Sequence, residues 1–347
     1  MSYLQVPKMG FLFHIPEMYF NYRNVLNLLD RDSFDIVLPD EASESLLDIM
    51  AAEEYRFSYI SELLQSKTLY RYLISDHIFL HDYQLMNQLG SRQIKFSSEL
   101  GCDRLHLNNW NKLYDMILCF GRYQEKKLKF CERSWIFQVG WPQYDPFFQE
   151  WNPDYEALNE HFGCDPHKPT ILWLPYFEGL SSIDIYAERM AALTDRYNVL
   201  VKPHDYTLLE EYERIQLLDQ LPFTSVLKRP MDTLPLLLLA DTVFADYGNT
   251  PFPPLYCDKR LILLSVPFAP EHEYVGFGSS DITLRSYLPT LKPESRLDEF
   301  HALLEDEAPW ERFFRKKNML KERFFASTYG SSAQKCAEIL NSLDRYL

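Results

Sequence analysis

Short apolar runs that stop abruptly on polar residues constrain the fold of this chain more than any other feature. The run Thr242–Ala245 ends at the polar stretch Asp246–Thr250, and the run Val199–Lys202 ends in the same way at Pro203–Asp205. Such runs are typical of buried strands in a parallel sheet, whose ligands bind outside the carboxyl ends of the strands. Because backbone N–H groups and hydroxyls at these ends attract phosphate, the pattern predicts a phosphate or nucleotide pocket.

Strand-like and helix-like patterns alternate along the chain and predict two α/β domains. Strands separated by helix-length segments imply a parallel sheet with right-handed crossovers. The alternation pauses near Trp141–Pro146 and restarts at Thr170. We therefore predict two Rossmann-like domains, 1–150 and 151–347, that face each other across a cleft. The expected strands are 10–15, 34–38, 72–75, 93–96, 116–120 and 135–139 in the first domain, then 170–174, 199–202, 225–227, 242–245 and 260–264 in the second.

Composition and charge exclude several classes of protein. The formal net charge is −15, whereas binding to nucleic acid needs a positive footprint. The six cysteines are scattered and form no C-x-x-C pair, which argues against a disulfide framework or a zinc site. The sequence shows neither a signal-peptide pattern nor an apolar run of about 18 residues. We expect a cytoplasmic protein that binds no nucleic acid and holds no metal.

The polar strand ends of the second domain have a functional interpretation and an ordinary one. In the first, Asp246 caps the turn that follows it, and Asn249 and Thr250 donate hydrogen bonds to a diphosphate. In the second, the same residues form an ordinary Asx or Ser/Thr turn. His204 can donate to a phosphate oxygen or act as a general acid, or it is an ordinary histidine at the edge of a domain. Lys202 is either part of the same site or a surface charge.

The first domain offers candidates for a general base. Glu99 follows the expected strand 93–96, and His14 lies on the first strand. Either side chain can take a proton from an acceptor hydroxyl if it faces the cleft. A carboxylate after a strand is also typical of a helix cap or a surface residue.

The segment from Trp310 to Phe324 combines aromatic and basic residues at helical spacing. An amphipathic helix of this type can lie on an anionic membrane surface. We expect instead that it packs its apolar face on the domains and exposes its charged face to solvent, with peripheral membrane contact as the alternative.

The stretches 114–118, 139–145, 171–176, 201–204, 236–264 and 327–333 carry motifs that agree with one family in order and spacing. They resemble motifs of the CDP-glycerol glycerophosphotransferases, the family of teichoic-acid polymerases and primases and related capsule polymerases. Residues 236–264 resemble the family pattern LL-x-x-aDxLITDYSSxxFDxxxxxKPiI, and 201–204 stand where the family has its R-x-HP element. The further matching stretches are 114–118 and 139–145 (YD-apolar … GxPRxD), 171–176 (ILYAPT) and 327–333 (DGxas).

The resemblance implies a GT-B fold and metal-independent transfer, with a cytidine nucleotide held in the second domain. It places His204, Asn249 and Thr250 on the diphosphate. The sequence departs from the family at three points. Where the family has a Ser-Ser pair, this chain has Gly248-Asn249, and where the family has an arginine, it has Gln143. The family's WHG motif, which carries the presumed base, should fall near 96–98, where this chain has no histidine. Either Glu99 or His106 then takes over the role of base, or the substrates differ, or the chemistry has been lost.

These observations together predict a metal-independent transferase of GT-B fold. It moves glycerol phosphate, ribitol phosphate or a sugar from a CDP- or UDP-linked donor to a polysaccharide or lipid-linked acceptor, in the cytoplasm or at the inner face of the membrane. No further cofactor is expected. The alternatives are an enzyme like UDP-N-acetylglucosamine 2-epimerase and a non-catalytic binding member of a polysaccharide-assembly system. The predicted catalytic residues are Glu99 and His204, and the predicted nucleotide-binding residues are Lys202, His204, Tyr176, Asp246, Gly248, Asn249 and Thr250.

Overall fold

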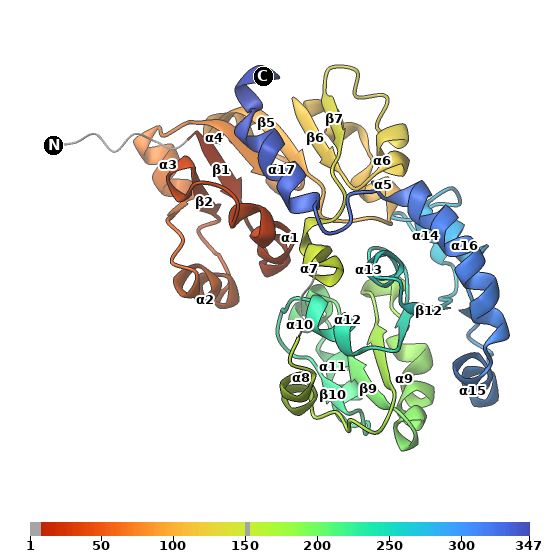
Figure 1. Ribbon diagram of the computed structural model, residues 1–347. Helices are drawn as coiled ribbons and strands as arrows, with labels where there is room; N and C mark the ends of the chain where they lie inside the picture. Colours follow the sequence, from red (N-terminus) through yellow and green to blue (C-terminus); the bar gives the residue numbers. More distant parts are fainter. Residues whose placement is uncertain (1–7, 150–152) are drawn as a thin grey trace. The chain divides into compact units, whose positions relative to one another are not determined.

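The computed structural model describes residues 8–149 and 153–347, which divide into two compact units (Figure 1). Unit 1 comprises the described residues up to Ser98 together with 107–149 and 322–347. Unit 2 comprises 99–106 and the described residues from 153 to 321. The predicted boundary between residues 150 and 151 lies outside the described residues. Two stretches differ from the predicted domains: 99–106 was predicted in the first domain but belongs to unit 2, and 322–347 was predicted in the second domain but belongs to unit 1.

Unit 1 is built on a parallel sheet of seven strands in the order β3-β2-β1-β4-β5-β6-β7. Every residue of β1 and β2 is buried, as expected for strands covered by helices on both faces. The strands are β1 Met9–Leu12, β2 Phe34–Leu38, β3 Phe57–Tyr59, β4 Tyr70–Ser75, β5 Gly90–Phe96, β6 Met116–Cys119 and β7 Trp135–Gln138. All were predicted except β3, a three-residue edge strand that is exposed or half-buried and therefore lacks the apolar signal.

The helices of unit 1 include one from the end of the chain. They are α1 Pro16–Leu26, α2 Glu44–Ala52, α3 Ile60–Ser66, α4 Tyr83–Leu89, α6 Arg122–Lys127, α7 Asp145–Phe148 and α17 Ser332–Asn341. Helix α5 Asp103–His106 comes between α4 and α6 in the chain but belongs to unit 2. Helix α17 packs against α1 (Figure 1). The buried carboxylate of Asp145 accepts hydrogen bonds from the backbone N–H groups of Ser332 (3.1 Å) and Ala333 (2.6 Å). Asp145 therefore satisfies two of the orphan donors at the start of α17 and fixes this helix within unit 1.

Unit 2 is built on a second parallel sheet, with six strands in the order β10-β9-β8-β11-β12-β13. The strands are β8 Thr170–Leu174, β9 Asn198–Val201, β10 Ser225–Val226, β11 Thr242–Ala245, β12 Arg260–Leu264 and β13 Thr290–Leu291. The helices are α8 Tyr155–Phe162, α9 Ile183–Ala191, α10 Asp205–Glu210, α11 Tyr212–Asp219, α12 Leu234–Leu239, α13 Phe252–Tyr256, α14 Ser280–Arg285, α15 Leu297–Glu305 and α16 Ala308–Phe324, whose last three residues belong to unit 1. The sequence predicted all these strands except β13, which has only two residues.

Helix α16 contains the aromatic and basic segment. Trp310, Phe313, Leu320 and Phe324 are buried, whereas Phe314 is exposed. The apolar face of the helix is therefore packed within the protein, as expected, and its amphipathic pattern needs no membrane to explain it. Among the described residues, no helix combines the length and the apolar character needed to cross a membrane.

Each sheet has one place where the direction of strand progression reverses. In unit 1 this switch point lies between the neighbouring strands β1 and β4, and in unit 2 it lies between β8 and β11. Loops leaving the carboxyl ends of two such strands diverge to opposite faces of the sheet and leave room for a ligand between them. The fold therefore marks one candidate binding region in each unit.

Candidate functional site

His204 follows β9, the strand beside β8, and caps helix α10. Its Nδ1 accepts a hydrogen bond from the backbone N–H of Tyr206 (3.1 Å). This bond requires an unprotonated Nδ1, so in the neutral ring Nε2 carries the proton. Burial lowers the pKa of His204 below its ordinary value, while the charges of Glu99 and Asp205 act in the opposite direction. His204 is therefore a neutral imidazole that presents an Nε2–H donor at the carboxyl end of the sheet.

Glu99 lies in the segment 99–106, which belongs to unit 2 although the strands before and after it are in unit 1. A carboxylate oxygen of Glu99 lies 2.9 Å from Nε2 of His106, and both side chains are about a quarter exposed (26% and 24%). Glu99 is also one of the charges that act on His204. The structure thus brings the two residues predicted to be catalytic into one region and pairs Glu99 with the alternative base.

Asp246 comes directly after β11 and is fully buried. Its Oδ2 accepts hydrogen bonds from the backbone N–H groups of Tyr176 (2.9 Å) and Ser182 (2.7 Å). Burial raises the pKa of Asp246 to about 7, even though these bonds and the charge of Arg285 favour the ionised form. Instead of capping the turn that follows it, as the functional interpretation proposed, Asp246 holds the loop after β8 against β11.

Two glycines allow the segment 99–106 to lie directly on the loop after β11. Gly101 and Gly248 both have positive φ (88° and 61°), and a Cβ atom on Gly101 would lie 2.1 Å from the carbonyl oxygen of Gly248. The buried carboxylate of Asp281 joins the two segments, because its Oδ2 accepts from the backbone N–H of Cys102 (3.2 Å) and of Gly248 (3.1 Å). Asn249 adds a third bond by accepting from the N–H of Leu100 (3.0 Å).

The other predicted nucleotide-binding residues are largely engaged within unit 2. Tyr176 is only 1% exposed, and its ring lies under Gly248. Lys202 is buried, with its Nζ 3.5 Å from a carboxylate oxygen of Asp205. Thr250 accepts from the N–H of Asp246 and donates to the carbonyl of Tyr247, both at 3.1 Å, so its hydroxyl forms an ordinary turn. These residues shape the loops around His204.

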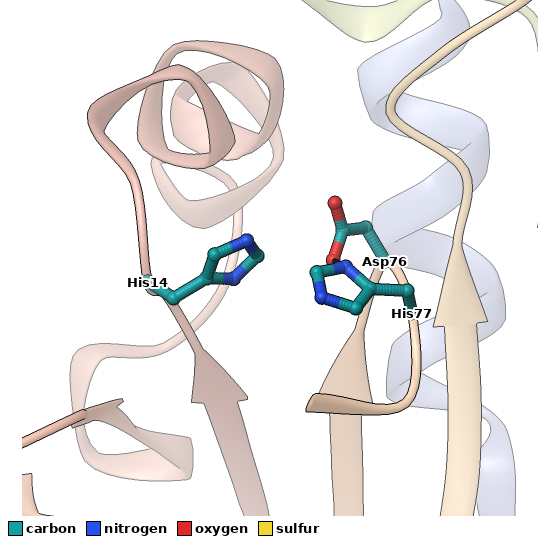
Figure 2. A group of neighbouring side chains, drawn as sticks. All are labelled: His14, Asp76 and His77. Atoms are coloured by element: carbon teal, nitrogen blue, oxygen red, sulfur yellow. Dashed lines mark hydrogen bonds and ion pairs between the residues drawn. The ribbon is translucent and has the colours of Figure 1, made fainter. Parts of the chain in front are cut away.

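Sequence reasoning did not single out Asp281 or the residues around His14. Asp281 could not be found, because its partners Cys102 and Gly248 are remote from it in the sequence. His14 itself was predicted as a candidate base, and the structure places it in unit 1 beside Asp76 and His77, which follow β4 (Figure 2). A usable signal existed here, since Asp76-His77 ends an apolar strand in the same way as Asp246 ends β11.

The architecture of two parallel sheets with covering helices is the fold of the GT-B glycosyltransferases, as predicted. A variant of the wall teichoic acid polymerase TagF soaked with CDPG matches with a TM-score of 0.65 and 14% identity, over 99% of this chain and 90% of that one. The Anabaena protein Alr3699/HepE in complex with UDP and glucose matches with a TM-score of 0.59 and 10% identity, over 97% and 100%. A glycosyltransferase from Rickettsia africae matches with a TM-score of 0.54 and 11% identity, over 98% and 99%. No protein-family model matches the sequence, and no curated protein does.

The close packing at Gly248 gives a prediction about stability. A Cβ atom there would lie 2.4 Å from the ring of Tyr176, on a backbone with positive φ, so Gly248→Ala should lower the free energy of unfolding by about 1–3 kcal/mol or more. Gly278→Ala is the matched control, because a Cβ atom there meets nothing within 4 Å; its effect should stay within about 0.5 kcal/mol. Urea denaturation measures both, and equal losses would contradict the packing described.

The raised pKa of Asp246 gives a prediction about pH. Between the ordinary pKa of 3.8 and the folded value of about 7, the unfolded chain is ionised at this position and the folded chain is protonated. The contribution of Asp246 to stability is therefore lost as pH rises through this window. The wild type should lose stability between pH 5 and pH 8, whereas Asp246→Asn has no carboxyl group to titrate at this position. The free energy of unfolding of the variant minus that of the wild type, measured by urea titration, should therefore increase over this range. A difference that does not change with pH would mean that Asp246 is ionised throughout.

Proposed function

We propose that this chain is a GT-B transferase that uses a nucleotide-activated donor. The unit transferred is glycerol phosphate, ribitol phosphate or a sugar, the donor is CDP- or UDP-linked, and the acceptor is a polysaccharide or a lipid-linked glycan reached from the inner face of the membrane. The observation that carries the proposal is His204, a neutral Nε2–H donor at the carboxyl end of a parallel sheet, close enough to Glu99 for the charge of Glu99 to act on its pKa.

The proposal is supported by what the similar structures contain. The TagF variant was soaked with CDPG, and the Anabaena protein was crystallised with UDP and glucose. Both are similar to this chain over nearly its whole length. A pyrophosphate group near the switch point of unit 2 would suit both kinds of donor.

In this mechanism His204 donates its Nε2–H to the diphosphate and stabilises the charge that develops as the nucleotide leaves. A donor that is already oriented costs no reorganisation during the reaction, and the bond from Tyr206 fixes this orientation. The loops formed by Tyr176, Asp246, Gly248, Asn249 and Thr250, with Lys202 beside them, would shape the proposed donor site. The transfer needs no metal at the diphosphate and no further cofactor.

Glu99 is the proposed general base toward the acceptor hydroxyl. Its contact with Nε2 of His106 (2.9 Å) orients the carboxylate and leaves it partly exposed, as a group that receives a proton from a substrate must be. This pair would take the place of the histidine of the family's WHG motif.

Nucleotide binding tests the donor site. One of CDP, UDP and GDP should raise the melting temperature of the wild-type protein by mass action. His204→Ala should abolish this rise, whereas His167→Ala, which removes an exposed imidazole before β8, should retain it. Thermal shift assays measure all three proteins. If none of the nucleotides has an effect, the transferase proposal fails; an effect that survives His204→Ala would move the donor site elsewhere.

The role of Glu99 is tested separately from binding. Glu99→Gln should keep the nucleotide effect but reduce the release of CDP from CDP-glycerol, or of UDP from UDP-glucose, by about 10²–10⁴-fold in the presence of a lipid-linked glycan acceptor. Glu210→Gln, at an exposed carboxylate on α10, is the control and should leave the rate unchanged. Nucleotide binding without turnover in the wild type would favour the non-catalytic binding protein.

A further inference from the structure

The switch point of unit 1 gathers two imidazoles and a carboxylate. His14 lies two residues beyond β1, and Asp76 and His77 directly follow β4, the neighbouring strand. The two strands pair in parallel with Phe11 opposite Ile74. Continued by three residues, this register brings His14 opposite His77. Figure 2 shows the three side chains turned toward one another from these two strand ends.

The distances suit a single bound cation. One ligand atom from each residue can be chosen so that all lie within 4.8 Å of one another. The rings of His14 and His77 meet edge to face with centroids 4.5 Å apart, and Nδ1 of His77 lies 2.6 Å from Oδ1 of Asp76. Tetrahedral zinc with bonds of about 2.1 Å holds its ligand atoms about 3.4 Å apart. Small rotations of the side chains are therefore enough to place all three around one ion.

The surroundings of Asp76 also suit a metal ligand. The side chain is only 12% exposed. The hydroxyl of Ser98 donates to Oδ2 (3.1 Å), which leaves Oδ1 on the side of His77. A hydrogen-bonded carboxylate of this kind is typical of a metal ligand held by a second layer of contacts.

We propose that His14, Asp76 and His77 form a site for a divalent transition metal ion of the zinc type. Imidazole nitrogens suit zinc and related ions, whereas magnesium and calcium prefer sites made of oxygen alone. Three protein ligands leave a coordination position open for water or for an oxygen of a bound molecule. The proposed site departs from the sequence-based expectation of a metal-free protein, and it does not depend on the proposed transferase activity.

Metal binding is tested on the full-length, tag-free protein after treatment with a chelator. Calorimetric titration with Zn²⁺ should show one equivalent bound at this site, and Mg²⁺ should not compete. The variant His14→Ala/His77→Ala should lose this equivalent. His161→Ala/His167→Ala, which also removes two imidazoles, both exposed, should keep it. The absence of stoichiometric binding by the wild type, or binding unchanged in His14→Ala/His77→Ala, would overturn the proposal.

Two further measurements keep the test decisive if the double variant does not fold. Co²⁺ bound to the wild type should give the intense visible absorption of a four- or five-coordinate site, and the weak spectrum of a six-coordinate aqueous ion would contradict the site. Ser98→Ala should weaken Zn²⁺ binding about 10–100-fold by removing the hydrogen bond to Asp76. An unchanged affinity would show that Asp76 is not a ligand. Neither readout involves a nucleotide, so the outcome is separate from that of the transferase proposal.

Discussion

The structure depends on one constraint, which is that all strands of a parallel sheet end at the same edge. The helices that return the chain cover both faces of each sheet, so polar side chains gather at this edge and above all where the strand order reverses. Unit 2 places Tyr176 and Asp246 at its reversal, with His204 beside them, and unit 1 places His14, Asp76 and His77 at its own. Two different sets of chemical groups thus occupy equivalent positions in two sheets of the same design.

The segment 99–106 follows β5 in the chain but belongs to unit 2. The N–H groups of Leu100 and Cys102 donate to Asn249 and Asp281 of the same unit. Glu99 therefore stands beside a backbone held by hydrogen bonds, although it lies on a loop. This arrangement gives the proposed base the rigidity that loops normally lack.

The strands could be predicted from the sequence because burial on both faces leaves a strong apolar signal, and only β3 and β13, which are short edge strands, were missed. His204 and Glu99 could be found because they follow such strands. The roles of Asp246 and Asn249 could not, because their hydrogen-bond partners Tyr176 and Leu100 are remote in sequence. For the cluster around His14, the polar pair Asp76-His77 at the end of β4 was a visible signal, but only the pairing of β1 with β4 brings this pair to His14.

The contact between Gly101 and Gly248 has a consequence for how this sequence can change over time. Gly101 cannot acquire a side chain while the loop of Gly248 stays in place, because a Cβ atom on Gly101 would overlap the carbonyl of Gly248. Drift at Gly101 is therefore conditional on a shift of the loop after β11, a form of epistasis imposed by main-chain atoms. Among distant relatives, a side chain at this position should appear only together with a change in that loop.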